Sequence, residues 1–136
     1  MTSYLLDTNI VSDLVRNPQG RITAHVRDIG EKQVCTSIIV AAELRYGAAK
    51  RGSARLAAQV EAVLGFLLVQ PLEAPADVLY AELRNRLERA GTPIGANDLL
   101  IAAHAVALGC MLVTDNEREF ARIPGLRLEN WLIPSP

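Results

Sequence analysis

The sequence predicts an α/β fold, a three-layer α/β/α sandwich around a mostly parallel central sheet, on three observations. Short apolar runs alternate along the chain with longer segments that have helical spacing. Capping residues, glycines and prolines separate the two kinds of segment. Half of the 136 residues are hydrophobic, which is enough for one buried core. Strands that alternate with helices form parallel sheets covered on both faces, so we expect three layers.

Five short apolar runs are expected to form the strands. In chain order they are SYLL, QVCTS, FLLVQ ahead of Pro71, CMLVTD and, at an edge of the sheet, LRLENWLI. Each run is bounded by polar or turn-forming residues, as strands are.

The segments between these runs are expected to be helices. The first, IVSDLVR, follows Asp7, Thr8 and Asn9, which are residue types that cap helix starts. The two helices on either side of Gly52 should pack together as a hairpin. The helices after the first are expected at residues 21–29 with Gly30 as C-cap, at IIVAAELRYGAAK after Ser37, at about residues 54–64, at residues 76–89, and at LLIAAHAVALG, opened by Asn97 and Asp98.

The net formal charge of −1 gives the chain no basic field of the kind that marks many nucleic-acid-binding proteins. Global charge therefore neither supports nor excludes an RNA partner. Among the 14 cations only Lys32 and Lys50 are lysines, and arginine suits bidentate phosphate contacts. The candidate phosphate contacts, which could instead be solvated or paired with Glu82 and Glu88, are Arg45, Arg84, Arg86 and Arg89.

The chain shows no sign of export or membrane insertion. Its start lacks the basic region of a signal peptide, and no apolar run reaches the roughly 18 residues of a membrane span. Cys35 and Cys110 lie within apolar stretches, where we expect buried, reduced thiols. We therefore expect a single domain over residues 1–136, a cytoplasmic location and no membrane partner.

Four acidic residues fall where parallel α/β sheets bind ligands, at the carboxyl ends of the strands. Asp7 follows the first strand and Asp115 the fourth. Glu43 lies about two turns into the helix after the second strand, and Asp98 opens the helix before the fourth. Carboxylates are hard oxygen ligands, so these four side chains together could hold Mg²⁺ or Mn²⁺.

Three of these acids also have a purely structural explanation. Asp7 is a good helix N-cap, and Asp98 could interact with the dipole of the helix that it opens. Glu43 could be solvated at the edge of its helix, or paired with Arg45 or a more distant arginine. An unpaired carboxylate at the head of the apolar helix of Asp98 would be costly, which favours a functional role.

The fourth acid, Asp115, is more ambiguous. Thr114 and Glu117 have the spacing of a capping box, so the DNERE run could be a solvated turn. His104 lies within an apolar helix with no carboxylate nearby in the sequence, and we expect it to be packed in the core rather than catalytic.

Four segments of the chain carry a family resemblance. They are LLDTNIVSDL, AAELRYGA, PIGANDLLIAAHAVALG and LVTDNEREFARIPGLRLENW, and they resemble VapC-like PIN domains in the family's order and over nearly the whole chain. The resemblance implies a PIN-like fold and a type II toxin with Mg²⁺-dependent endoribonuclease activity on structured RNA. It also implies a VapB-like antitoxin as partner and a toxin homodimer within a larger toxin–antitoxin complex.

The resemblance assigns roles to three of the acids. Asp7 and Asp98 match the family's principal metal ligands, and Glu43 completes the ligand set or orients a water. Thr8 and Asn9 complete the motif that begins at Asp7. The implied reaction is hydrolysis by a water that the ion acidifies, which leaves a 5′-phosphate and a 3′-hydroxyl.

The fourth acidic position departs from the family pattern. Many PIN domains have an acid two residues after the threonine that ends the strand, which is Thr114 here. That position is Asn116, and the acid present, Asp115, comes one residue early. The role of Asp115 as a ligand is therefore open, and the amide of Asn116 could orient a water instead.

Two other enzyme or signalling classes and one binding class compete with this interpretation. An aspartyl-phosphate phosphatase usually has a second Asp two residues after the first, where this chain has Asn9. A phosphate-accepting receiver domain needs an Asp after the FLLVQP run and a Lys near the last strands, and the sequence has neither. A PIN-like module could bind antitoxin or RNA without catalysis, but the intact set of Asp7, Glu43 and Asp98 argues against it.

Overall fold

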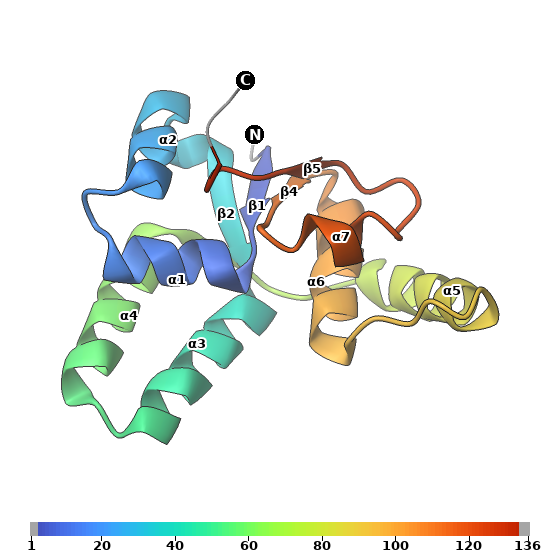
Figure 1. Ribbon diagram of the computed structural model, residues 1–136, viewed down its shortest axis with the longest axis horizontal. Helices are drawn as coiled ribbons and strands as arrows, with labels where there is room; N and C mark the ends of the chain where they lie inside the picture. Colours follow the sequence, from blue (N-terminus) through green and yellow to red (C-terminus); the bar gives the residue numbers. More distant parts are fainter. Residues whose placement is uncertain (1–2, 134–136) are drawn as a thin grey trace.

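The structure, a computed structural model, describes residues 3–133 and is built on one five-stranded sheet (Figure 1). All neighbouring strands are parallel, and their order is β3-β2-β1-β4-β5. Each of the five expected runs contains a strand, and the predicted fold class is confirmed. The strands are β1 (Tyr4–Leu6), β2 (Val34–Ser37), β3 (Leu68–Gln70), β4 (Met111–Val113) and β5 (Leu128–Glu129).

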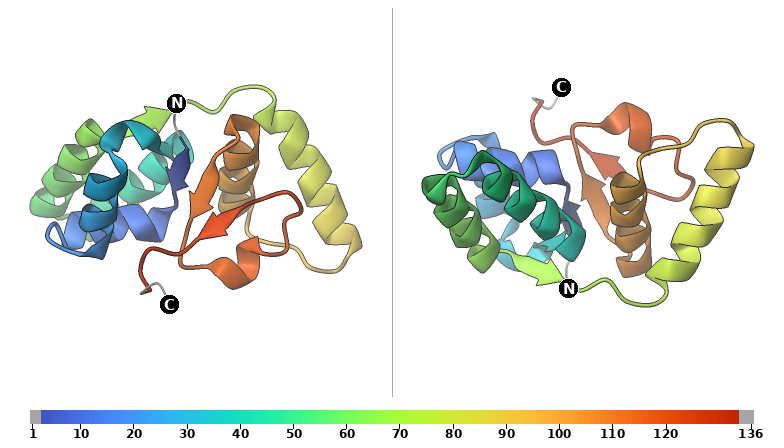
Figure 2. Two further views of the ribbon diagram at one scale, coloured as in Figure 1. Left: turned by 90° about the horizontal axis from the view of Figure 1, so that it is seen from above. Right: turned by 90° about the horizontal axis from the view of Figure 1, so that it is seen from below.

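Helices cover both faces of the sheet. In the two views of Figure 2, α1 to α4 lie on one side of the strands and α5 and α6 on the other. The chain moves from β1 to β3 in one direction and then returns across the sheet to β4, so right-handed crossovers place the two sets of helices on opposite faces. The helices are α1 (Thr8–Arg16), α2 (Arg21–Ile29), α3 (Ile38–Arg51), α4 (Ala54–Phe66), α5 (Ala76–Arg89), α6 (Ala96–Leu108) and α7 (Glu117–Phe120), with a short 3-10 turn at Glu31–Gln33.

The helix ends show why these segments start and stop where they do. The Asp7 carboxylate caps α1 by accepting from the Thr8 backbone N–H at 2.8 Å. The Ser37 hydroxyl caps α3 by accepting from the Ile39 N–H at 3.0 Å. Gly30 ends α2 with a φ of 99°, a value that favours glycine. These caps confirm the sequence predictions, whereas the short helix α7 was not predicted.

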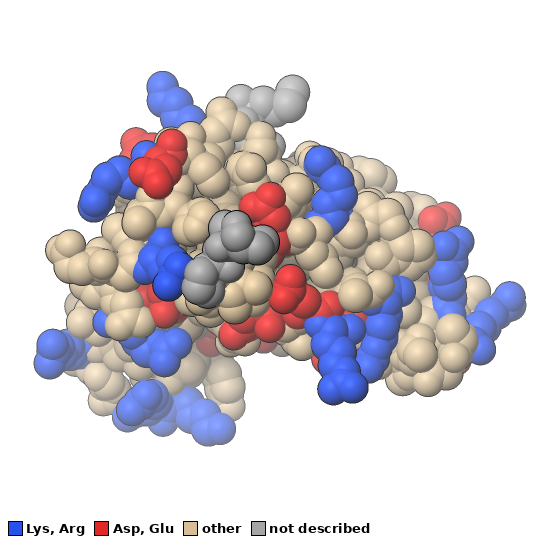
Figure 3. All heavy atoms as spheres, turned by 45° about the horizontal axis from the view of Figure 1, so that its top comes forward, with Lys and Arg blue, Asp and Glu red and all other residues tan. Residues whose placement is uncertain are grey.

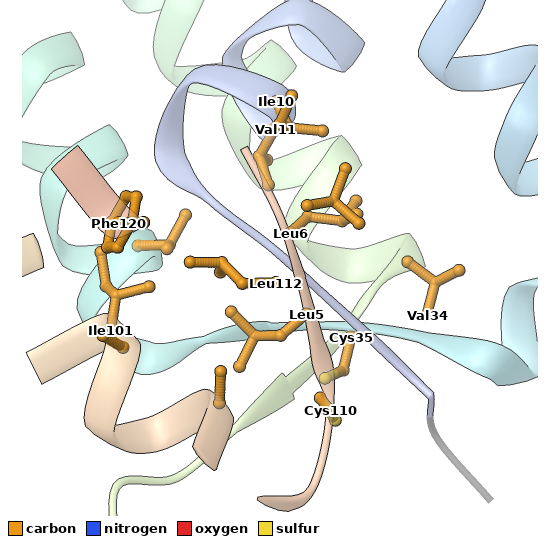
Figure 4. Close-up of a cluster of buried hydrophobic side chains, with 14 of the residues drawn as sticks. Leu5, Leu6, Ile10, Val11, Val34, Cys35, Ile101, Cys110, Leu112 and Phe120 are labelled. Carbon is orange, nitrogen blue, oxygen red and sulfur yellow. The ribbon is translucent and has the colours of Figure 1, made fainter. Parts of the chain in front are cut away.

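The main core lies between the sheet and its helices. Leu5 and Leu6 of β1 and Leu112 of β4 are completely buried at its centre (Figure 4). Cys35 and Cys110 lie next to one another there as buried thiols that are not joined in a disulfide, in line with the sequence prediction.

A second apolar cluster closes the hairpin of α3 and α4, which the sequence also predicted. Within residues 3–133, no helix has the length and apolar character needed to cross a membrane.

Candidate active site

Asp7 lies where the carboxyl ends of β1 and β4 meet, and it is only 3% exposed. Its Oδ1 accepts from the backbone of Thr8, and its Oδ2 accepts from the Thr114 hydroxyl at 2.7 Å. Burial raises the pKa of Asp7, and these two hydrogen bonds oppose the rise. The negative charges of Glu43 and Asp115 raise it further. Asp7 is therefore the N-cap that the sequence suggested and also a buried carboxylate fixed by a second strand.

Glu43, two turns into α3, faces the same place. Its Oε1 accepts from the Thr8 hydroxyl at 2.6 Å, and its Oε2 accepts from the side-chain amide of Asn97 at 3.4 Å. Its possible partner Arg45 instead makes a two-pronged ion pair with Glu61 of α4, with 2.8 Å between Nε and Oε2. Glu43 is thus held by two polar neighbours that carry no charge and forms no ion pair among the described residues.

Asp98 lies in the first turn of α6 and is partly buried. Burial raises its pKa to about 7, with further contributions from a hydrogen bond with Glu119 and from the charges of Asp7, Glu119 and Glu43. The structure therefore brings Asp7, Glu43 and Asp98 within electrostatic reach of one another. It adds Glu119, whose Oε1 is buried without a hydrogen-bond partner among the described residues.

Glu119 is the site residue that sequence reasoning missed, because the DNERE run looked like a solvated turn. The run instead forms α7, with Asn116 at its N-cap and Phe120 completely buried. The buried ring anchors this short helix beside α6 and so places the neighbouring Glu119 against Asp98. An asparagine followed four residues later by a large apolar residue was the signal that could have revealed the helix.

Asp115 and Asn116, which follow Thr114 after the end of β4, make contacts of their own. Asp115 is exposed and accepts from the Asn9 side-chain amide at 2.9 Å. The backbone N–H of Asn116 donates to the Thr114 hydroxyl at 3.0 Å. The capping box that the spacing of Thr114 and Glu117 suggested does not form, because Asn116 is the N-cap of α7 and the Thr114 hydroxyl accepts from the backbone N–H of Asn116.

Several residues outside the acidic site have structural partners. His104 is buried, with its Nδ1 2.8 Å from the Ser37 hydroxyl oxygen, and burial lowers its pKa. This confirms the prediction of a packed histidine. Arg84 forms an ion pair with Glu88, one helical turn later, at 3.0 Å. Pairing with Glu88 was the alternative to a phosphate contact that the sequence left open.

The acidic donors suit a hard divalent cation. Within residues 3–133, no three His, Cys, Asp or Glu side chains stand close enough to enclose a metal ion. Mg²⁺ keeps several waters and usually binds through one or two carboxylates, so it does not need such a cage. After burial and a hydrogen bond with Glu119, the negative charges of Asp7, Glu119 and Glu43 also raise the pKa of Asp98, and Oε1 of Glu119 is buried without a hydrogen-bond partner among the described residues. The residues present therefore fit Mg²⁺ or Mn²⁺.

The charge on the surface is separated into regions. In the space-filling view of Figure 3, several Asp and Glu side chains gather near the middle of the molecule, with Lys and Arg side chains beside them and around the edges. A polyanion that met a cation at an acidic centre could contact arginines on its flanks.

Sequence comparisons place the chain among known proteins. The PIN domain family matches residues 4–126. The tRNA(fMet)-specific endonuclease VapC of Salmonella typhimurium is 37% identical over 135 residues, covering 96% of this chain and 99% of that protein. Ribonuclease VapC2 of Rickettsia felis is 40% identical over 130 residues, covering 94% of this chain and 97% of that protein.

The comparison of structures agrees. A chain in the crystal structure of VapBC2 from Rickettsia felis, bound to a DNA fragment from their promoter, has a TM-score of 0.87 and 38% sequence identity to this chain. The match covers 96% of this chain and 99% of that one. The acidic edge of the sheet, the fold and the full-length likeness to ribonucleases lead to one conclusion. The chain belongs to the PIN-domain family and is a VapC-type ribonuclease toxin of a toxin–antitoxin system.

Proposed function

We propose that the chain hydrolyses RNA phosphodiester bonds with Mg²⁺ held at the carboxyl edge of the sheet. One observation carries the proposal: electrostatic interactions link four acids that are distant in sequence, and none of them forms an ion pair among residues 3–133. These acids are Asp7, Glu43, Asp98 and Glu119. Isolated helix caps would not gather in this way. Mn²⁺ has the same ligand preference and could substitute.

Each residue has a role in this proposal. Asp7 and Asp98 hold the ion, because Asp7 is buried, Asp98 is partly buried, and the charge of Asp7 acts on Asp98. Glu43, fixed by the Thr8 hydroxyl, completes the ligand set or orients the attacking water. Glu119 takes the fourth acidic position, next to Asp98, and the exposed Asp115 supports the site through its bond to Asn9 and its charge near Asp7. When bound, Mg²⁺ would neutralise phosphate oxygens and acidify a water.

Thr114 and Asn116 support this arrangement from the end of β4. The Thr114 hydroxyl donates to Oδ2 of Asp7 and accepts from the backbone N–H of Asn116. This pair of bonds leaves Oδ1 of Asp7 to the N–H of Thr8. The carboxylate is thereby held in one orientation, as a metal ligand requires.

The relatives suggest a substrate and a partner. The Salmonella relative is specific for tRNA(fMet), so we propose this tRNA as the first substrate to test. The Rickettsia structure is a VapBC complex, and we propose that a VapB-like antitoxin brings a cationic side chain to Asp7 and Asp98 and so blocks the site. We further propose a toxin homodimer within that complex, active in the cytoplasm, with residues 1–136 forming one domain.

Expression in bacteria tests this function. The wild-type chain alone is expected to arrest growth, and co-expression of its cognate VapB-like antitoxin is expected to restore it. Asp98→Asn should be harmless, because it keeps the side-chain shape and removes a charge that the ion needs. Equal growth with the wild type and with Asp98→Asn, both without antitoxin, would contradict the proposal.

A further inference from the structure

A groove of about 170 Å³ leads away from the acidic site between α1, α3 and α4. Glu43 lines it at the site, and Arg51, eight residues later on the same helix, lines it about 12 Å farther along. Its walls are apolar and include the buried side chains of Val15, Ala48 and Val60. The groove thus borders the proposed catalytic centre at Glu43. A larger hollow of about 500 Å³ near α2 is lined by none of the acids of the site.

Two arginines border the groove without a carboxylate partner. Arg16 ends α1 and donates from Nε to its own helix, to the carbonyl of Ser12 at 3.4 Å. Arg51 ends α3, and both arginines are exposed. The two ion pairs found within residues 3–133 involve neither of them. In Figure 3, basic side chains also gather at the lower left, the side on which the α3–α4 hairpin lies in Figure 1.

Gly47 lines the groove halfway along and has no structural reason to be glycine. It lies within α3, its φ is not positive, and a Cβ built on it meets no described atom within 4 Å. Glycine inside a helix is less stable than alanine, so the fold would gain from a side chain there. Such a side chain would enter the groove. The missing side chain therefore keeps the groove open.

We propose that this groove binds an RNA nucleotide next to the phosphate that is cleaved. This inference rests on the ribonuclease activity proposed above. The base or ribose would pack on the apolar walls, and phosphates would contact Arg16 and Arg51. Charge favours RNA over an antitoxin segment, because a segment cationic enough to neutralise the acids would be repelled by these arginines. A strand of RNA, in contrast, would meet positive charge at both places: the metal ion held by the acids, and the guanidinium groups of Arg16 and Arg51 along the groove.

The experiment measures RNA binding without cleavage. All proteins carry Asp98→Asn, and their affinity for a fluorescent tRNA(fMet) transcript is compared with and without a second change. Gly47→Leu fills the groove and is expected to weaken binding about tenfold, the order of effect of losing one buried apolar contact. Gly65→Leu is the matched control, because Gly65 also lies in a helix with no described atom near its Cβ position and does not line the groove.

Arg51→Gln is a second, surface-exposed change that should leave folding intact. It is expected to reduce the slope of log affinity against log salt concentration by about 0.7 to 0.9 for each phosphate that the arginine neutralises in the wild-type complex. Arg27→Gln, an exposed arginine in the last turn of α2 that does not line the groove, should leave the slope unchanged.

If Gly47→Leu left the RNA affinity, and Arg51→Gln left the salt slope, equal to those of the protein with Asp98→Asn alone, the inference would be overturned. If the variants bound RNA with unchanged affinity but bound the antitoxin more weakly, the groove would be assigned to the antitoxin. Absence of cleavage by the wild-type chain would count against the ribonuclease proposal alone, because this assay requires no cleavage.

Discussion

Asp98→Asn is expected to slow RNA hydrolysis on the order of a thousandfold. Asp98 sits among Asp7, Glu43 and Glu119, and its carboxylate is one of the two proposed principal ligands of the ion. Asparagine is nearly the same size but is neutral, so the shape of the site is kept and its affinity for a divalent cation falls. The initial rate of tRNA(fMet) cleavage at saturating Mg²⁺ measures the effect.

Asp77→Asn provides a matched control for this change. Asp77 also lies in the first turn of a helix, α5, but it is exposed and lies outside the acidic site. Its loss should weaken only the interaction with its helix dipole, by about 0.3 to 1 kcal/mol, and should leave the cleavage rate unchanged. Equal rates for Asp98→Asn, Asp77→Asn and wild type would show that Asp98 is only a helix-dipole partner.

Mg²⁺ is expected to stabilise the wild-type chain at pH 8 and to have little effect at pH 5. In the metal-free fold the pKa of Asp98 is about 7, against an ordinary value of 3.8, so its ionisation opposes folding. The contribution of Asp98 to the free energy of unfolding is therefore fully present below about pH 4, where its carboxyl group is protonated in both states, and is lost as the pH rises through 7. Mg²⁺ binds the ionised form, so its effect grows over the same range.

Thermal unfolding at the two pH values, with EDTA or with Mg²⁺, measures this linkage. A hundredfold excess of Mg²⁺ over its dissociation constant adds about 2.7 kcal/mol, roughly 10 °C for a domain of this size. Without metal at pH 8, Asp98→Asn should melt above the wild type, and it should lose most of the response to Mg²⁺. A metal-free Asp98→Asn protein that melts below wild type at pH 8, with a full response to Mg²⁺, would exclude Asp98 as a ligand.

The elements that the sequence predicted are those with local signals. The strand at Met111–Val113 is an apolar run, and α3 begins at a serine whose hydroxyl bonds the backbone two residues later. The rule that parallel sheets bind ligands at their carboxyl ends was enough to bring Asp7, Glu43 and Asp98 together. The order of the strands had no such signal, because it depends on crossovers between distant segments.

The parts of the site that escaped prediction depend on tertiary contacts. Glu119 reaches Asp98 only because the buried Phe120 packs α7 beside α6. The Thr114 hydroxyl fits both a helix cap and a bond to Asp7, and only the packing of β4 beside β1 selects the second. Arg45 could have paired with an acid on its own helix, and the hairpin instead places Glu61 within its reach.

The groove also depends on tertiary structure and could not be predicted from the sequence. In the sequence, Gly47 is one small residue within AAELRYGA and suggests only a weaker helix. Its meaning depends on α1 and α4, which leave the space above it empty, and on the absence of any described atom within 4 Å of its Cβ position. The role of Gly47 in the groove can be recognised only when the positions of the surrounding helices are known.

Cleavage of tRNA(fMet) by the purified chain tests the central claim most directly. With Mg²⁺ we expect a cut that leaves a 5′-phosphate and a 3′-hydroxyl, because water attacks the phosphorus and the acids Asp7, Glu43 and Asp98 hold the ion beside it. EDTA should abolish the reaction, and Mg²⁺ or Mn²⁺ should restore it. Cleavage that persists in EDTA, or that leaves a 2′,3′-cyclic phosphate, would show that the 2′-hydroxyl attacks without a metal and would contradict the proposed mechanism.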